Sequence, residues 1–485
     1  MNKSFIRYTL LSVIGLEGIA IIISAIVGFF YKESQAFIFL ICGLVYLLLG
    51  TINFRNKPKN NMFFAKDGFV MCALSWIFMS LCGAIPMVLS KDIPFFVDAF
   101  FEIVSGFTTT GSTILTNVEG LSRTAMFWRL FTHWFGGMGI LVFVMAILPL
   151  GGGYGIHILK AESPGPVVGK LVPKLSSTAK ILYGIYSGMT FIEVILLLIC
   201  KMPLYESVTL SFATAGTGGF GLLADGFASY SSAVQIIVGI FMLLFGINFN
   251  VYYFILIGKA KEALKSEELR WYLCIVAIAV CLITVNTMNL EIYSGFLDTL
   301  KHSFFQVSSI ITTTGFATVD FNEYWPTFSK IIIVALMFCG ACAGSTGGGF
   351  KVSRVVMLLK DAKNRLLRNI SPRNVRNVHF EGKPVDKDVI ESTKSYLCIY
   401  VLVFIVSLLI IGLDSSFNFT ECFTAVTATI NNIGPGLGKI GPMGGFSDFS
   451  VLSKLILSFD MLAGRLELIP MLILFSPNTY KRKKI

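Results

Sequence analysis

Ten runs of about 20 mostly apolar residues follow one another along this chain of 485 residues, and a helix of that length can cross the hydrocarbon core of a membrane. Of all residues, 55% are hydrophobic and only 14% are charged, whereas a soluble domain carries about 25% charged residues. This composition excludes a cytosolic enzyme, a nucleic-acid-binding protein and a disordered scaffold. The sequence therefore predicts an all-α integral membrane protein with ten transmembrane helices, over residues 8–30, 35–54, 68–89, 124–149, 180–200, 232–257, 271–289, 328–358, 393–413 and 453–476.

The positively charged residues predict how these helices are oriented. With the N-terminus in the cytoplasm, 28 of the 39 Lys and Arg residues fall in segments on the cytoplasmic side and eight on the other side. Because Lys and Arg concentrate in the cytoplasmic loops of membrane proteins, we expect both termini in the cytoplasm. The net charge of +11 is then mainly an orientation signal and does not indicate a nucleic-acid partner.

Between the runs lie four apolar stretches that resemble one another and are too short to cross a membrane. They span residues 95–110, 204–215, 297–314 and 417–431. Each is rich in Phe, Ser and Thr, and each leads through a Thr, Ala or Asn step to a glycine. We expect four re-entrant half-helices that end in glycine turns, since irregular backbone inside a membrane is tolerated only where it is buried in protein or lines water.

The four stretches divide most of the chain into units of one architecture: a span, a half-helix, a glycine turn and a second span. We expect a leading two-span hairpin over residues 1–66, followed by four pore repeats around one central pore. The repeats cover residues 67–150, 151–260, 261–388 and 389–485. The third contains a broken helix and a basic cytoplasmic segment.

Glycine turns around a central hole suit a bare cation, because glycine allows backbone conformations that point carbonyl oxygens at the ion. Threonine hydroxyls add ligands or pack behind the carbonyls. The glycines that we match between the four stretches are 105, 99 and 119 residues apart. The predicted cation filter comprises Thr109, Thr110, Gly111, Thr214, Ala215, Gly216, Thr313, Thr314, Gly315, Asn432, Ile433 and Gly434.

The eighth apolar run is broken by five glycines between Gly340 and Gly349, and each glycine costs a helix about 1 kcal/mol relative to alanine. We predict a flexible loop beneath the filter that acts as a gate; close helix packing through small residues is the alternative. A positive charge, Arg465, stands in the middle of the last run, where it either forms a barrier in the pore or belongs to a buried salt bridge. The predicted gate residues are Gly340, Gly344, Ser345, Thr346, Gly347, Gly348, Gly349, Lys351 and Arg465.

Seven segments resemble the Trk/Ktr/HKT superfamily of potassium transporters, and most of all its bacterial TrkH-type membrane subunits. They are residues 105–112, 134–140, 213–219, 312–316, 340–351, 431–436 and 464–467. The resemblance implies potassium as the substrate, bound at the filter residues, because the intact set of four filter glycines goes with a preference for potassium over sodium. It also implies a bacterial cytoplasmic (inner) membrane location, a homodimer, and a cytosolic nucleotide-binding regulatory subunit that docks near residues 351–388. No bound cofactor is expected.

Two other functions stay open at this point. In the first, the same fold carries sodium, or sodium together with potassium. The sequence does not decide whether transport is coupled to protons or to sodium. The second is a membrane-embedded enzyme such as a lipid-linked transferase. An enzyme of that kind needs acidic or histidine residues clustered at one membrane face, and the sequence contains no such cluster.

Overall fold

The computed structural model describes residues 2–55, 65–139, 175–371 and 377–480. In this part of the chain the regular structure is helical apart from one short hairpin, β1 (His379–Phe380) paired with β2 (Lys383–Pro384). The predicted all-α class is confirmed. Residues 140–149 of the fourth predicted span lie outside the described residues, as does the predicted boundary between the first two repeats.

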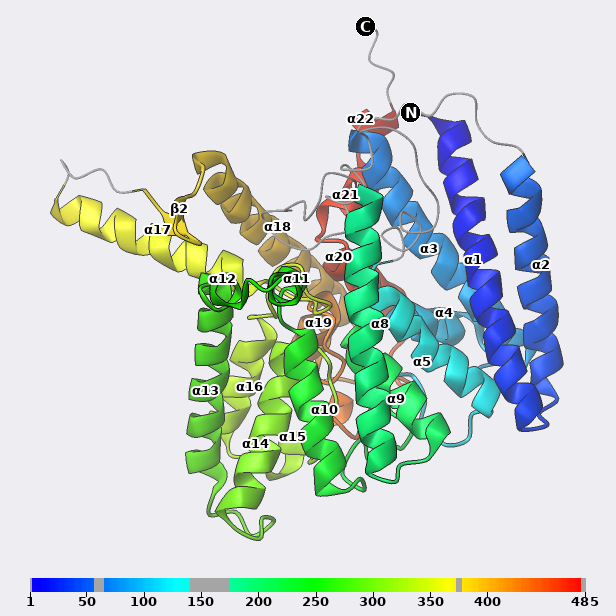
Figure 1. Cartoon of the computed structure of the whole chain (residues 1–485), viewed down its shortest axis with the longest axis horizontal. Helices are drawn as coiled ribbons and strands as arrows, with labels where there is room; N and C mark the ends of the chain where they lie inside the picture. Colours follow the sequence, from blue (N-terminus) through cyan, green and yellow to red (C-terminus); the bar gives the residue numbers. More distant parts are fainter. Residues whose placement is uncertain (1, 56–64, 140–174, 372–376, 481–485) are drawn as a thin grey trace, which may run out of the picture.

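The leading hairpin consists of α1 (Lys3–Phe30) and α2 (Gln35–Arg55), which stand at one side of the molecule (Figure 1). Glycines let the two helices pack closely. A methyl group built on Gly15 would lie 2.8 Å from the Cα of Gly50, and one on Gly18 would lie 2.7 Å from the carbonyl oxygen of Gly43. Small residues at such contacts are typical of helix pairs in membranes.

After this hairpin the same order of helices occurs four times. Each unit opens with a long helix: α3 (Ala65–Leu89), α8 (Leu175–Ile199), α13 (Glu267–Thr287) and α18 (Lys387–Ile411). A half-helix follows: α4 (Phe96–Phe107), α9 (Leu204–Gly216), α14 (Phe296–Ile311) and α19 (Phe419–Ile430). The chain then turns back through a helix that we call the return helix: α5 (Arg123–Gly137), α10 (Ser232–Phe245), α16 (Thr327–Met337) and α20 (Val451–Arg465).

Serine residues set where three of the return helices begin. The Ser122 hydroxyl accepts a hydrogen bond from the Ala125 N–H at 3.2 Å, and Ser450 caps Ser453 in the same way at 3.3 Å. Ser231 caps α10 through the Val234 N–H. Serine is a favoured N-cap because its side chain satisfies a backbone donor that the first turn leaves unpaired.

The return helices are interrupted where we predicted continuous spans over 232–257 and 453–476. Helix α10 is followed by α11 (Phe249–Leu256) at an angle of 92°. Helix α20 ends at Arg465, and α21 (Ile469–Phe475) begins after two residues with positive φ, Glu467 and Leu468. The break predicted near residue 340 is present between α16 and α17 (Val352–Ile370).

Counted by length and hydropathy, six helices of the described residues can cross a membrane on their own, or seven if α10 and α11 form one bent span. The predicted number of ten treats each return segment as a single helix. Helices α5, α16 and α20 have 15, 11 and 15 residues, and each is too short to pass alone.

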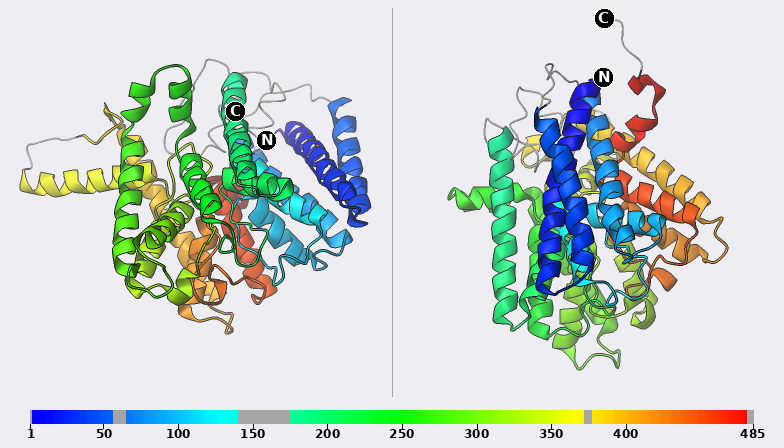
Figure 2. Two further views of the ribbon diagram at one scale, coloured as in Figure 1. Left: turned by 60° about the horizontal axis from the view of Figure 1, so that its bottom comes forward. Right: turned by 90° about the vertical axis from the view of Figure 1, so that its right-hand side faces the viewer.

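The remaining helices are short connections: α12 (Ala260–Leu264), α15 (Phe321–Tyr324), the 3₁₀ turn η1 (Gly438–Ile440) and α22 (Pro477–Tyr480). The start of α1 and α22 lie at the same end of the molecule (Figure 1). Helix α17 projects away from the helical body, as Figure 1 and the left view of Figure 2 both show.

Candidate functional site

All four half-helices end in the same backbone turn. The residue that leaves the helix has a left-handed conformation, with φ between 53° and 58°, and its N–H bonds to the carbonyl three residues back. The next N–H bonds to the carbonyl five residues back, at 2.8 to 2.9 Å in every copy. This is the Schellman pattern that closes many helices. The left-handed residues are Thr109, Thr217, Thr313 and Asn432.

These hydrogen bonds establish which residues of the four turns correspond. Two positions after each left-handed residue stands a glycine, which gives Gly111, Gly219, Gly315 and Gly434. The first, third and fourth turns match the prediction. In the second turn the predicted match to Gly216 is wrong by three residues, since Thr214, Ala215 and Gly216 all lie within α9.

Helix α9 continues to Gly216 because that glycine packs directly on the backbone of His133 in α5, where a side chain would collide. Comparing the Ala-Gly step with the Thr-Thr-Gly of the other copies gave the wrong register. The segment Thr217-Gly218-Gly219 also has the Thr-X-Gly pattern, and this pattern was the sequence signal for the correct register.

The four turns close into a ring in the order of the chain. We call residues 109–111, 217–219, 313–315 and 432–434 the four-turn ring. A methyl group built on Gly219 would lie 2.6 Å from the Thr314 carbonyl oxygen and 3.4 Å from the Gly111 Cα. Gly315 abuts the Ile433 carbonyl, and a methyl group on Gly434 would lie 2.9 Å from the Thr110 carbonyl oxygen. Side chains at these glycines would therefore strike the neighbouring turn.

Hydrogen bonds join the first and last turns directly. The Asn432 side-chain amide donates to Thr110 Oγ1 at 2.9 Å, and the Ser112 hydroxyl donates to the Gly434 carbonyl at 3.1 Å. The hydroxyls of Thr312 and Thr314 lie 2.8 Å apart and bond to each other. These side chains brace the ring, which favours the interpretation that threonines pack behind the carbonyls.

A cavity of about 300 Å³ adjoins one side of the ring, and all four ring glycines line it. The rest of its wall comes from Arg129 of α5 and from the segments that follow the four turns, including Ser112, Phe316 and Pro435. The ring is therefore the floor of a cavity to which every repeat contributes.

On the other side of the ring lies the α16–α17 loop (residues 338–351). It contains the predicted gate residues Gly340, Gly344, Ser345, Thr346, Gly347, Gly348, Gly349 and Lys351. The Gly348 N–H donates to Thr313 Oγ1 at 2.7 Å, so the loop is bonded to the ring itself. The loop also bonds to the break between α10 and α11, where the Cys342 N–H donates to the Gly246 carbonyl at 3.1 Å.

Two buried or half-buried cations hold this loop through its carbonyl oxygens. Arg465 donates to the Thr346 carbonyl at 2.7 Å and to the Gly136 and Gly137 carbonyls of α5 at 2.6 Å each. Lys351 donates to the Gly347 and Gly348 carbonyls. Arg465 thus ends α20 rather than standing in mid-span, and it cross-links the loop to the opposite return helix.

A family model described as a cation transport protein, TrkH, matches residues 35–482 of the chain. This chain belongs to the TrkH family. It is 34% identical over 466 residues to the Trk system potassium uptake protein TrkH of Salmonella typhimurium (strain LT2), which covers 95% of each protein. It is 31% identical over 487 residues to the Trk system potassium uptake protein TrkG of Escherichia coli (strain K12), with 98% of this chain and 99% of that protein covered.

The fold is also that of a solved relative. The crystal structure of the potassium transporter TrkH from Vibrio parahaemolyticus superposes with a TM-score of 0.89 at 29% identity, covering 99% of this chain and all of that one. This TrkH-family chain is a multi-pass bacterial membrane transport protein and not an enzyme. The transferase alternative is excluded.

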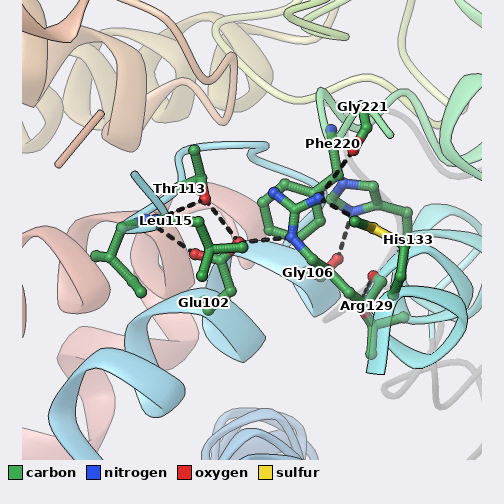
Figure 3. A network of polar contacts seen from close by, with 11 residues as sticks. Glu102, Gly106, Thr113, Leu115, Arg129, His133, Phe220 and Gly221 are labelled. Atoms are coloured by element: carbon green, nitrogen blue, oxygen red, sulfur yellow. Dashed lines mark hydrogen bonds and ion pairs between the residues drawn. The ribbon is translucent and has the colours of Figure 1, made fainter. Parts of the chain in front are cut away.

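In this TrkH-family chain a polar network supports the first two turns of the ring (Figure 3). Glu102 of α4 accepts a hydrogen bond from the Thr113 hydroxyl at 2.9 Å and pairs with Arg129 of α5 at 2.6 Å. Arg129 in turn donates to the Gly221 carbonyl at 3.1 Å. Both charges of this pair are fully buried, and the pair connects the segments that follow both turns.

His133 is the second brace between the same turns (Figure 3). Its Nε2 accepts the Phe220 N–H at 3.2 Å, so the proton sits on Nδ1, which donates to the Gly106 carbonyl at 2.7 Å. The neutral imidazole therefore satisfies the Gly106 carbonyl of α4 and the N–H of Phe220, which follows the second turn. The sequence contains no signal for this role, since His133 is one of four histidines that are scattered along the chain.

Proposed function

We propose that this chain takes up potassium ions through the four-turn ring, which acts as a selectivity filter. The observation that carries the proposal is that four equivalent turns close into one ring of backbone carbonyls beneath a shared cavity. A ring of carbonyl oxygens replaces the water that a cation loses on entry. The relatives named as potassium uptake proteins support potassium as that cation.

Two orphaned oxygens fit a cation path at the ring. Within the described residues, Thr109 Oγ1 and Asn432 Oδ1 are buried and have no hydrogen-bond partner. Buried acceptors without a partner are costly in a folded protein unless water or an ion occupies the site. The proposed filter residues are those predicted in turns one, three and four, with Thr217, Gly218 and Gly219 in place of Thr214, Ala215 and Gly216.

We further propose that the α16–α17 loop and Arg465 form the gate below this filter. Two contacts support this role: the loop is bonded to Thr313 of the ring, and Arg465 joins the loop to α5 on the opposite wall. A positive charge beside the path also adds an electrostatic barrier for an incoming cation. Opening then requires the carbonyl bonds of Arg465 and Lys351 to break or rearrange.

We also propose where the transporter acts and how it assembles. It acts in the bacterial inner membrane with both termini in the cytoplasm, as a homodimer of chains that each hold one pore in four repeats behind a leading hairpin. A cytosolic nucleotide-binding subunit docks near residues 351–388, a placement that the projecting helix α17 supports. An inside-negative potential supplies about 2.3 kcal/mol per charge per 100 mV, which suffices for uptake without a coupled ion.

The test is ion flux in liposomes that contain the purified full-length chain, with potassium and sodium compared at equal gradients. We expect potassium flux well above sodium flux, and no dependence on a proton or sodium gradient. As a matched pair, Gly219→Ala should impair selectivity, whereas Gly184→Ala, at a glycine of α8 with open space around it, should not. Equal potassium and sodium flux in the unaltered chain would instead favour the sodium-carrying alternative.

A further inference from the structure

Glu268, in the first turn of α13, is bonded both to the α16–α17 loop and to the helix that follows it. Its Oε1 accepts the N–H of Ala343, within the loop, at 2.8 Å and the N–H of Ser353, in the first turn of α17, at 3.1 Å. The side chain is 4% exposed. One buried carboxylate oxygen therefore joins the loop to the helix that leaves it.

This carboxylate acts as the missing cap of α17. The N-cap residue of that helix is Lys351, whose side chain forms no capping hydrogen bond and is used instead on the loop carbonyls. The first turn of a helix has backbone donors without helical partners, and an anion there is favoured by the helix dipole. Glu268 supplies the anion from 85 residues away in sequence.

A second carboxylate binds the helix that carries Glu268. Glu381, at the tip of the β1–β2 hairpin, accepts the N–H of Glu267 at 3.0 Å and the N–H of Glu268 at 3.1 Å. It also accepts the Ser266 hydroxyl at 2.8 Å. Glu381 has a φ of 52°, which is uncommon for a residue with a side chain. In this conformation its carboxylate caps the start of α13.

The hairpin is tied to α17 as well. Lys360 of α17 pairs with Glu267 and donates to the His379 carbonyl of β1 at 2.8 Å. The Glu381 N–H donates back to Glu267 at 3.2 Å. Hairpin, α13 and α17 are thus connected at one point, so a displacement of the hairpin is transmitted to the cap of α13 and to Glu268.

Beside this connection lies a cavity of about 880 Å³ whose wall includes Ala343, Ser353, Glu268 and Glu381. The cavity adjoins the loop at the residue that Glu268 holds. The loop therefore has open space on that side, and the bonds of Glu268 hold it there, in addition to its bonds to Thr313 and Arg465.

We propose that Glu268 and Glu381 are positioning residues that form a relay: Glu381 couples the hairpin to α13, and Glu268 couples α13 to the α16–α17 loop and keeps it closed. The relay rests on the proposed function of this loop as a gate. A partner that moves the hairpin would release the loop without touching it. The geometry assigns these carboxylates to control of opening, and not to contact with the ion.

The first test measures potassium flux in liposomes with the full-length chain and no regulatory subunit. Glu268→Ala removes both acceptor bonds and is expected to raise potassium flux at least about tenfold. The loss of one hydrogen bond to a charged group already shifts an equilibrium constant by more than about a factor of ten. Glu268→Gln retains an acceptor oxygen and should stay close to the unaltered chain. The potassium-to-sodium ratio should not change in either variant.

Glu381→Ala should raise flux less, and the double variant should not exceed Glu268→Ala, because the two residues act in series. Glu262→Ala is the control: this exposed carboxylate lines the same cavity and pairs with the exposed Lys259, so its removal should have no effect. Unchanged or lower flux in well-folded Glu268→Ala protein, or fully additive effects, would overturn the relay.

Hydrogen exchange of backbone amides in Glu381→Ala gives a readout independent of transport, at a substitution in the surface hairpin. We expect faster exchange in peptides that cover residues 340–353, with no change in peptides that cover the four-turn ring. Unchanged exchange at 340–353 would overturn the relay even if the chain transports potassium. Conversely, faster exchange in a chain that carries no potassium would leave the relay standing and overturn the proposed function.

Discussion

The four turns of the ring differ in regularity from the three interruptions that the described residues show in the return helices, after α10, α16 and α20. Every turn has the same two backbone hydrogen bonds, the same left-handed residue and a glycine two positions later. The interruptions share no such pattern. Helix α10 bends by 92° into α11, a loop separates α16 from α17, and α20 stops before two residues with positive φ.

This difference separates two tasks. A site that coordinates an ion from all sides needs equivalent groups, and backbone turns supply them independently of side-chain identity. A site that opens needs at least one element with two available positions, and here only the third repeat provides a long loop there within the described residues. We call the four-turn ring the regular layer and the interruptions of the return helices the irregular layer. We infer that the regular layer selects the ion and that the irregular layer controls its access, and the following variants test this inference.

Arg465→Ala breaks the irregular layer most directly and has the largest expected effect. The guanidinium makes three hydrogen bonds to carbonyls of the loop and of α5, so its loss frees the loop and removes a positive charge. We expect potassium flux to rise about a hundredfold, the equivalent of about 2.7 kcal/mol. Flux in liposomes measures this, together with the potassium-to-sodium ratio, which should stay constant.

The control for Arg465 is Arg365→Ala, which removes a cation that is 68% exposed and pairs with Asp361 on α17. Its flux should match that of the unaltered chain. If Arg465→Ala protein is well folded and carries less potassium, the arginine is a packing residue and the division between the two layers fails at this position.

Gly219→Ser breaks the regular layer at the turn whose register the sequence did not reveal. The added Cβ would lie 2.6 Å from the Thr314 carbonyl, which must move away from its neighbours. We expect the potassium-to-sodium ratio to fall about tenfold, since local strain of 1–3 kcal/mol suffices for that change. A selectivity as high as that of the unaltered chain would contradict the assignment of Gly219 to the ring.

His133→Leu sharpens the comparison, because it leaves the ring residues intact and removes a brace behind them. The Phe220 N–H and the Gly106 carbonyl lose their partner, while Arg129 still holds the Gly221 carbonyl. We expect selectivity to fall about threefold, equivalent to about 0.7 kcal/mol, as measured by competition between sodium and a potassium tracer. His379→Leu, at a partly exposed hairpin residue, should leave selectivity unchanged; an equal loss there would show that the brace is not specific.

The regular layer was largely predictable from sequence. Four short apolar stretches and their glycines gave the half-helices, and three of the four turns were placed correctly. The prediction for the second turn failed because Gly216 and Gly219 both follow small residues, and what decides between them is a contact with the backbone of His133 in another helix. Contacts between distant helices leave no local trace in the sequence.

The irregular layer was predictable only where glycines accumulate. Five glycines predicted the α16–α17 loop, but the bend at residues 246–248 and the end of α20 at Arg465 occur within runs that we predicted as single spans. The role of Glu268 was equally hidden, because an acidic residue at the start of a helix is explained by the helix dipole alone. Its second set of bonds, to Ala343 and Ser353, appears only in three dimensions.

Asp414→Asn has the smallest expected effect, at the outer end of a return helix where the caps are regular. Asp414 accepts the N–H of Ser450, the N-cap of α20, at 2.9 Å, and this bond lowers the pKa of the carboxyl against the opposing effect of its partial burial. A lowered pKa in the folded state means that the ionised form stabilises the protein above the ordinary pKa near 3.9. That contribution is lost as the pH falls through the lowered value. We therefore expect Asp414→Asn to reduce the stability in detergent by about 0.5 kcal/mol at pH 7, with the difference shrinking below about pH 4, and to leave flux and selectivity unchanged. A change in flux would mean that the outer ends of the return helices take part in access, and the division into a selecting layer and a controlling layer would have to be redrawn.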